Sequence, residues 1–242
     1  MPFFWIGGLV CGLFETMHVG NELVTMSAFE AGSALDLIES EHVTIAQGWP
    51  HQGKTLSEHP SFSARDRSTI RRSMLIGLAL PEHALPEHSS TSLGMTEMCS
   101  SHLLWDPYEP LQPHQEGAYG KSMEGIQHKV IDPITGVDVP IGEDGELCAR
   151  GYSLMLGLHR REREDVFDHD GWYHTGDAGH FDDDGFFHFI GRLTEMIKTP
   201  GGANVAAPEV EAALMEYPEV LEAYVTGIPG DDDGQFVVAA VV

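Results

Sequence analysis

The first hundred residues combine one long apolar run with several short ones. Residues 6–17 are almost continuously apolar and predict a buried helix, while residues 34–39 place apolar side chains at helical spacing. The apolar stretches at 22–26 and 43–48 predict strands, and 75–80 is another apolar run. Helices that alternate with strands in this way favour a parallel sheet with covering helices.

From about residue 115 the pattern changes to short alternating strands separated by turns. Strands are predicted at three positions, residues 127–131, 145–150 and 186–190. Asp-Gly pairs predict turns at 144–145, 170–171 and 184–185. This part of the chain therefore predicts a small antiparallel sheet or barrel.

A third pattern begins after Arg192. A glycine loop at 200–202 leads to a helix that is predicted to open near Pro208, with acidic residues in its first turn. Strands are predicted at about 220–227 and 236–242. A final strand with no element to cover it indicates a truncated domain.

Charge and cysteine content narrow the possible partners. The chain has 13 basic and 38 acidic residues, a formal net charge of −25, which disfavours binding to nucleic acid or to anionic membrane surfaces. Cys11, Cys99 and Cys148 are far apart, so no disulfide framework is expected and a reducing, cytoplasmic compartment fits. No apolar run approaches the roughly 20 residues that a transmembrane helix needs.

Residues 91–97, Thr-Ser-Leu-Gly-Met-Thr-Glu, are the first segment with candidate chemistry. Small residues around Gly94 let the backbone approach a ligand, and Thr96 offers a hydroxyl to a phosphate oxygen. Glu97 offers the carboxylate that Mg²⁺ prefers when it also binds phosphates. The alternative for this segment is an ordinary turn followed by a helix start.

Two later segments offer groups for a nucleotide. Residues 172–177, Trp-Tyr-His-Thr-Gly-Asp, end in an acidic residue that is suited to ribose hydroxyls at a strand end, although another aspartate turn is the alternative. In the segment that starts at Gly191, this glycine admits a sharp chain reversal. Arg192 offers a fork of donors to ribose or phosphate oxygens, and the glycine loop that follows is able to act as a flap.

In this order, the three segments resemble the motifs of the adenylate-forming superfamily of acyl-CoA synthetases, luciferases and peptide-synthetase adenylation domains. Residues 145–151, Gly-Glu-Leu-Cys-Ala-Arg-Gly, and the proline-aromatic segment at 2–9 resemble two further motifs of that family. The resemblance covers nearly the whole chain. It implies a partial acyl-CoA synthetase-like fold, which is α/β with a β-barrel-like subdomain, plus a truncated small α+β C-terminal domain.

The resemblance also implies domain limits. Residues 1–192 would be the later part of the N-terminal AMP-binding domain, α/β to about residue 110 and β-rich over 111–192. Residues 193–242 would be the start of the C-terminal domain. The family's phosphate loop would lie before residue 1 and its late catalytic lysine beyond residue 242, so the chain is expected to be a fragment that lacks full activity by itself.

The activity that the resemblance implies is that of an AMP-forming acid–CoA ligase. A carboxylic acid, with a fatty acid as the expected class, would react with ATP and Mg²⁺ to give an acyl-adenylate, and coenzyme A would then accept the acyl group. Thr96 and Glu97 would be catalytic, with Glu97 as the Mg²⁺ ligand. The positions assigned to cofactor binding are Ser92, Leu93, Gly94 and Met95 beside adenine and acyl group, Asp177 and Arg192 at the ribose, and Lys198, Gly201 and Gly202 in the moving loop.

The sequence departs from the family pattern at several positions. Leu93 replaces the usual aromatic residue beside adenine, and Trp5 stands where a histidine is frequent. Thr194 and Pro200 change the hinge and the moving loop. Two other functions remain open, namely an adenylation module that loads a carrier protein and a non-catalytic remnant with at most nucleotide-binding ability.

The sequence pattern around the remaining histidines and cysteines predicts no further site. His169, His174, His180 and His188 are close in sequence but form no His-Glu-x-x-His unit, so hydrogen-bonding roles are favoured over a zinc site. Cys99 follows Glu97 by two residues and is expected to be a lining or buried thiol with no base to activate it.

Overall fold

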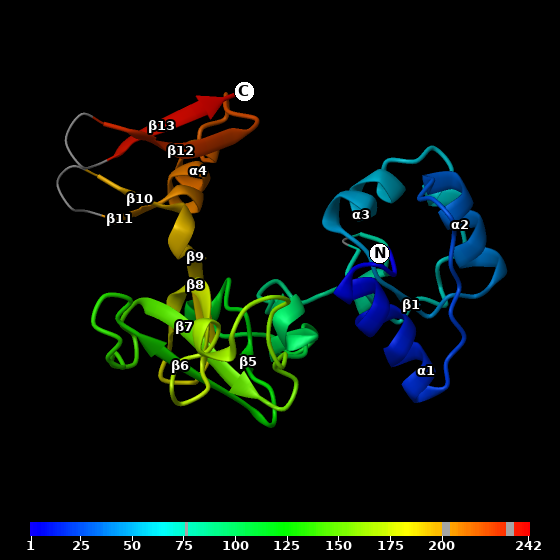
Figure 1. Cartoon of the computed structure of the whole chain (residues 1–242). Helices are drawn as coiled ribbons and strands as arrows, with labels where there is room; N and C mark the ends of the chain where they lie inside the picture. The colour runs from blue at the N-terminus through cyan, green and yellow to red at the C-terminus, as the bar shows by residue number, and fades with distance from the viewer. Residues whose placement is uncertain (76, 200–203, 231–234) are drawn as a thin grey trace. The chain divides into compact units, whose positions relative to one another are not determined.

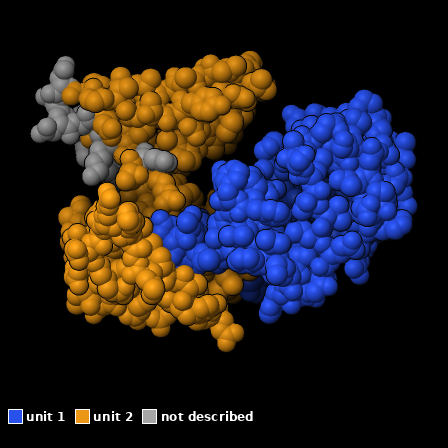
Figure 2. Space-filling view, turned by 45° about the vertical axis from the view of Figure 1, so that its right-hand side comes forward, with its two compact units in different colours: residues 1–101, 105–116 blue, residues 102–104, 117–242 orange. Residues whose placement is uncertain are grey.

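The computed structural model describes residues 1–75, 77–199, 204–230 and 235–242. These residues form two compact units, shown in different colours in Figure 2. Unit 1 comprises Met1–Ser101 and Trp105–Glu116, and unit 2 comprises His102–Leu104 and Gly117–Val242. Within the described residues, no helix has both the length and the apolar character needed to cross a membrane.

The predicted N-terminal helix forms but is not buried. A π-helical segment, η1 (Gly7–Phe14), continues into α1 (Glu15–Val19) and ends at Gly20, which has a φ of 72°. Of these helical residues only Gly8 is buried, and Phe14 is half exposed. The prediction of burial is therefore wrong, because an apolar run reports only composition and does not provide the neighbours that would cover it.

The core of unit 1 lies between α2 (Ala31–Ser40) and α3 (Pro50–Ser57) (Figure 1). Helix α2 contains the predicted apolar face, and its Leu35 and Ile38 pack with Leu56 of α3. The carboxylate of Glu30 caps the N-terminus of α2. It accepts hydrogen bonds from the backbone N–H groups of Gly32 and Ser33.

The predicted parallel sheet is present only as one pair of two-residue strands. Strand β1 (Ile45–Ala46) pairs in parallel with β2 (Arg72–Ser73), so the strand predicted at 43–48 is present but short. Residues 21–26 form neither helix nor strand, and the strand predicted at 22–26 is wrong because none of the described residues pairs with it. Four 3₁₀ turns and two strands complete the described elements of this region: η2 (Phe62–Ala64), η3 (Pro81–His83), η4 (Thr96–Met98), η5 (Pro113–Gln115), β3 (Leu93–Met95) and β4 (Ser100–Leu104).

Unit 2 contains a four-stranded antiparallel sheet in the order β6-β7-β8-β9 (Figure 1). Its strands are β6 (Ile126–Ile131), β7 (Gly145–Gly151), β8 (Tyr173–Phe181) and β9 (Phe187–Arg192). The three strands predicted from the sequence are confirmed. In the described part of the chain β6 and β9 are the edges, so the prediction of a sheet holds and no barrel closes. A short strand, β5 (Lys121–Ser122), pairs with the end of β4.

Two of the three predicted Asp-Gly turns are present. Gly171 and Gly185 have φ values of 80° and 82°, as tight turns require. Gly145 instead opens β7, where a Cβ atom would lie 2.3 Å from the carbonyl oxygen of Ile131. Glycine is needed at this position for the close approach of two strands, so the turn predicted at 144–145 is wrong.

The last fifty residues follow the predicted pattern closely. A 3₁₀ turn, η7 (Leu193–Glu195), leads to β10 (Met196–Lys198), which pairs with β11 (Asn204–Ala206). Helix α4 (Ala207–Met215) has Pro208 in its first turn, as predicted. Strands β12 (Ala223–Pro229) and β13 (Gln235–Val241) pair antiparallel and confirm the two predicted strands.

One further 3₁₀ turn, η6 (Arg163–Asp165), lies between β7 and β8.

Candidate functional site

The centre of β8 is a bulge. Pairing between β7 and β8 passes from Glu146 opposite Ala178 to Cys148 opposite His174, so Leu147 alone faces three residues of β8. These three residues are 175–177, and Gly176 among them has a φ of 73°. Bulges of this kind re-aim a side chain within a sheet. Asp177 therefore lies within a strand, and the prediction that it lies at a strand end is wrong.

Buried polar groups hold the bulge in place. The hydroxyl of Thr175 donates to the carbonyl of Leu147 at 2.7 Å and accepts from the backbone N–H of Asp177 at 3.0 Å. The backbone N–H of Gly176 donates to Oε1 of Glu146 at 3.2 Å. Thr175 and Glu146 are both buried, so each of these bonds is made away from solvent.

The bulge brings together two residues that the sequence assigned to the ribose. Asp177 lies opposite Arg192 of β9, and Nε of Arg192 is 3.0 Å from Oδ1 of Asp177. Nη1 of Arg192 also donates to the carbonyl of Thr175 at 3.0 Å. The Asp177 side chain is 3 % exposed, whereas that of Arg192 is 46 % exposed. The pair thus joins a buried acceptor to donors that solvent or a ligand can reach.

Gly191 has a different role from the one predicted. It lies inside β9, and it is absent from the residues with positive φ in the described chain. The sharp reversal expected at Gly191 is therefore wrong, and the chain turns only after Arg192, at η7.

Replacing Thr175 with valine is expected to lower the free energy of unfolding by roughly 1–3 kcal/mol. The valine keeps the shape of the side chain but leaves the buried carbonyl of Leu147 and the N–H of Asp177 without this hydroxyl. The measurement is urea unfolding at neutral pH. Thr226→Val on the exposed side of β12 is the matched control, since it makes the same chemical change at an exposed position. Equal effects of the two substitutions would contradict this account of the bulge.

The segment assigned to phosphate and Mg²⁺ is a strand followed by a single 3₁₀ turn. Met95 and Met98 are buried and anchor it, while Thr96 is exposed and Glu97 is half buried. The alternative interpretation, a turn followed by a helix start, is met only in its turn, because the strand β4 follows the 3₁₀ turn and no α-helix starts in these described residues. Gly94 lies so close to β4 that a Cβ atom would be 3.0 Å from the Cα of Ser101. The glycine thus serves strand pairing, whatever it does for a ligand.

The other residues that were assigned to cofactor binding lie in both units, and Cys99 lies close to them in unit 1. In unit 1, Ser92 is exposed and Leu93 is half buried. Cys99 is exposed in a left-handed conformation with a φ of 61°, so it is not the buried thiol that was one of the two expectations for it. In unit 2, Lys198 ends β10, and Gly201 and Gly202 lie outside the described residues.

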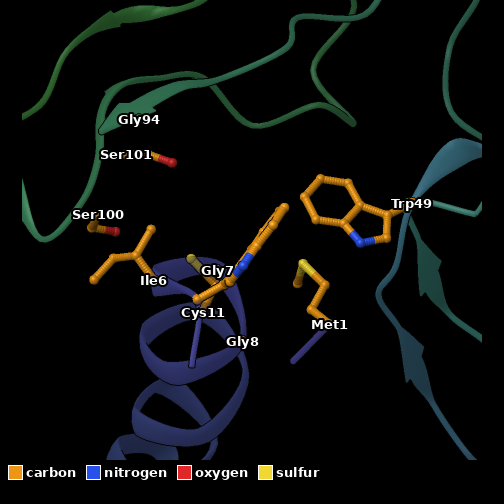
Figure 3. A pocket seen from close by; sticks show the side chains of 10 residues that line it. Met1, Ile6, Gly7, Gly8, Cys11, Trp49, Gly94, Ser100 and Ser101 are labelled. Carbon is orange, nitrogen blue, oxygen red and sulfur yellow. The ribbon is translucent and has the colours of Figure 1, made fainter. Parts of the chain in front are cut away.

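A cavity of about 170 Å³ in unit 1 is lined by apolar and small residues (Figure 3). The rings of Trp5 and Trp49 meet edge to face with their centroids 5.6 Å apart. Met1 and Cys11 add sulfur-containing side chains, and the backbone around Gly94 belongs to the lining. The cavity therefore suits an apolar group next to the segment that contains Thr96 and Glu97.

A pair of histidines in unit 2, the buried His102 and the half-buried His128, was not predicted from the sequence. Nδ1 of His102 lies 2.9 Å from Nε2 of His128, and Nδ1 of His128 lies 2.7 Å from the hydroxyl of Ser122. Burial lowers the pKa of His102 to about 4, and burial together with the neighbouring His102 lowers the pKa of His128 to about 3. Both rings are therefore neutral at pH 7, a feature that only the strand pairing reveals.

The sequence model of the family described as AMP-binding enzyme matches residues 1–159. The chain belongs to this family. The model of the C-terminal domain of AMP-binding enzymes also matches residues 209–242. The adenylate-forming resemblance expected from the motifs is thereby confirmed.

Several curated relatives match nearly the whole chain. The putative acyl-CoA synthetase YngI of Bacillus subtilis is 29 % identical over 97 % of this chain and 44 % of its own length. The 4-coumarate–CoA ligase 5 of Oryza sativa subsp. japonica is 35 % identical over 100 % of this chain and 47 % of its own length. The fatty acid–[acyl-carrier-protein] ligase ScoC of Streptomyces coeruleorubidus is 32 % identical over 100 % of this chain and 48 % of its own length. The chain thus spans about half the length of the curated relatives it matches.

Solved structures of adenylate-forming enzymes share the fold. The amide bond synthetase McbA from Marinactinospora thermotolerans superposes with a TM-score of 0.81 at 27 % identity, over 100 % of this chain and 50 % of its own. The O-succinylbenzoate coenzyme A synthetase MenE from Bacillus subtilis, in complex with ATP and magnesium ion, superposes with a TM-score of 0.78 at 27 % identity and the same coverage. The predicted fold class, a partial acyl-CoA synthetase-like fold, is confirmed.

Proposed function

We propose that the protein activates a carboxylic acid with ATP and transfers the acyl group to coenzyme A. The observation that carries this proposal is the contact between Asp177 on the β8 bulge and Arg192 at the end of β9, in a chain of the AMP-binding enzyme family. In the first step a carboxylate oxygen attacks the α-phosphorus, and the bond to the β-phosphate breaks to release pyrophosphate. In the second step the thiol of coenzyme A attacks the acyl carbonyl, AMP leaves, and the thiol proton passes to solvent.

The ribose contacts follow from the different exposure of the two paired residues. Asp177 is an acceptor that the bulge fixes before any ligand arrives, so it is suited to two hydroxyl donors at small entropic cost. Arg192 keeps part of its guanidinium accessible and can donate to ribose or phosphate oxygens. Both side chains would orient the nucleotide, and neither takes part in bond making.

Glu97 and Thr96 are proposed for the phosphate end of the nucleotide. A half-buried carboxylate next to an exposed hydroxyl fits Mg²⁺, which takes oxygen ligands and is bound through one or two carboxylates together with substrate phosphates. When bound, the ion would neutralise charge on the phosphate oxygens. Thr96 would donate its hydroxyl to an α-phosphate oxygen and so hold the phosphorus for attack.

We assign the apolar cavity beside Trp5 and Trp49 to the hydrocarbon part of the acid. The aromatic and sulfur-containing side chains of the lining offer apolar contacts and no charged partner, which suits the hydrocarbon part of an acid. A fatty acid is the substrate class that we propose; the name of ScoC specifies a fatty acid, whereas the name of the 4-coumarate–CoA ligase specifies an aromatic acid. Trp5, in place of the family's frequent histidine, would then limit the size of the acids that fit.

Loss of the Glu97 carboxylate is expected to reduce acid-dependent ATP–pyrophosphate exchange at least about a hundredfold, as removal of a group that stabilises transition-state charge does. The measurement is made on the longest natural form of the protein that contains these residues, as Glu97→Ala. Glu109→Ala, a change at an exposed glutamate of the same unit, is the control and should leave exchange unchanged. Exchange that is equal in wild type and Glu97→Ala would show that Glu97 holds no Mg²⁺.

A carrier protein is a second candidate for the acyl acceptor. The observation that favours it is the similarity to ScoC, whose name specifies an acyl carrier protein. Comparing coenzyme A with a phosphopantetheinylated carrier protein as acceptor separates the two functions. Thioester formation only on the carrier would replace the second step proposed above and leave the first step unchanged.

We propose that residues 193–242 are the start of a mobile C-terminal domain and that the loop from Lys198 to Gly202 takes part in the thioester step. A cytoplasmic location is also proposed, because Cys11, Cys99 and Cys148 are all free thiols.

A further inference from the structure

Three potential metal ligands converge on β7 and β8, in the sheet of unit 2. Glu146 and Cys148 are two residues apart on β7, so their side chains point to the same face. His174 of β8 is the direct partner of Cys148. One donor atom from each of the three residues lies within 4.8 Å of the other two, and Nδ1 of His174 is 2.9 Å from Oε2 of Glu146.

The three side chains differ in exposure in a way that suits ion binding. Cys148 is fully buried and Glu146 is buried, whereas the side chain of His174 is 42 % exposed. An ion can therefore reach the cluster from the side of His174 and is shielded from solvent on the other side. The second oxygen of Glu146 already accepts the N–H of Gly176, and such a bond orients a carboxylate ligand.

The charges around the cluster are mostly negative. Burial, followed by the nearby Glu146 carboxylate, raises the pKa of Cys148 to about 12, and Asp168 and Asp138 act in the same direction. Lys129 opposes them from β6, where it is the partner of Cys148 and lies 3.4 Å from Asp138. A cation bound at the cluster would take Cys148 as the thiolate, because a metal ion deprotonates a coordinating thiol outright.

We propose that Glu146, Cys148 and His174 form a binding site for one borderline-soft divalent cation of the Zn²⁺ type. Zn²⁺ takes thiolate, imidazole and carboxylate ligands at about 2.0–2.3 Å, which places neighbouring donor atoms roughly 3.3–3.6 Å apart. The donor atoms of the three side chains lie between 2.9 Å and at most 4.8 Å apart, which brackets this range. Side-chain rotations are therefore sufficient to bring all three donors to coordination distance of one ion. Binding exchanges the Cys148 proton for the ion, releases that proton to solvent and involves no oxidation.

This site is distinct from the Mg²⁺ position proposed at Glu97. The thiolate and imidazole donors favour Zn²⁺ over Mg²⁺, which prefers oxygen ligands only. Three protein ligands leave a fourth tetrahedral position for water. Because Glu146 holds the β8 bulge through Gly176, ion binding would also stabilise the strand that carries Asp177.

Titration of the 242-residue chain with Co²⁺ under reducing conditions tests the proposal. A thiolate-to-cobalt charge-transfer band is expected to appear, to saturate at one ion per chain, and to disappear when Zn²⁺ is added. Cys148→Ser should abolish the band, and His174→Gln should weaken ion binding at least about tenfold. The double variant Cys11→Ser/Cys99→Ser should keep the band, because neither thiol belongs to the cluster.

X-ray absorption of the Zn²⁺-loaded wild-type chain provides a test that does not depend on any variant. One sulfur neighbour at about 2.3 Å is expected, with the remaining neighbours being nitrogen or oxygen. A zinc shell without sulfur, or a cobalt band that persists in Cys148→Ser, would overturn the proposal. Neither measurement uses ATP or an acid, so the outcome is independent of the proposed ligase activity.

Discussion

Replacing Asp177 with alanine is expected to weaken binding of AMP to the 242-residue chain at least about tenfold. A carboxylate that accepts ribose hydroxyls makes charge-assisted hydrogen bonds, and each contributes roughly 1.5–3 kcal/mol. The substitution also removes the 3.0 Å ion pair that fixes Arg192, so the donor fork loses its orientation. Isothermal titration calorimetry with AMP measures the change directly.

Two further variants separate the ribose role from folding. Asp177→Asn keeps one acceptor oxygen and the side-chain volume, and its AMP affinity should lie between wild type and Asp177→Ala. Asp183→Asn, an exposed position in the turn after β8, should leave the affinity unchanged. If Asp177→Ala binds AMP as tightly as wild type while remaining folded, the nucleotide is held elsewhere.

Acidification from pH 7 to pH 4.5 is expected to destabilise unit 2 strongly through His102 and His128. Their folded-state pKa values of about 4 and about 3 lie below the unfolded value near 6.5, so between these limits the unfolded state binds more protons. The stabilisation from the neutral rings is complete above the unfolded pKa and is lost as pH falls toward the folded pKa. For His102 alone, lowering the pH from above the unfolded pKa to below the folded pKa would reduce the free energy of unfolding by about 3 kcal/mol.

The readout is the slope of unfolding free energy against pH, because many other groups titrate in the same window. The double variant His102→Gln/His128→Gln keeps hydrogen-bonding groups but has no proton to gain, and its slope should be flatter than that of wild type. His169→Gln serves as control, since this histidine is 88 % exposed. A wild-type slope that the double variant reproduces would mean that other groups cause the acid sensitivity.

The family and most of the late strands could be predicted from the sequence because local patterns determine them. Alternation and turn glycines located β6, β7 and β9, and Pro208 located the start of α4. The same reasoning failed at residues 22–26, where apolar side chains have no pairing strand. It also failed at Gly145, which permits a close strand contact and not a turn.

The local geometry of the site could not be predicted, because it depends on which residues face each other across strands. Nothing near residue 177 in the sequence indicates that Glu146 and Leu147 anchor the bulge that contains Asp177. The contact between His102 and His128 likewise joins residues 26 positions apart. The family motifs therefore assigned Asp177 and Arg192 to the same ligand group, whereas their direct contact is seen only in the pairing of β8 with β9.

The most direct test of nucleotide handling by this chain is to map AMP binding by amide nuclear magnetic resonance on the isotopically labelled chain. The largest shift changes are expected at Gly176, Asp177, Gly191 and Arg192, and they should disappear in Asp177→Ala. AMP binding with shifts centred away from the β8 bulge and the end of β9, or no binding at millimolar AMP (about −4 kcal/mol), would contradict the account.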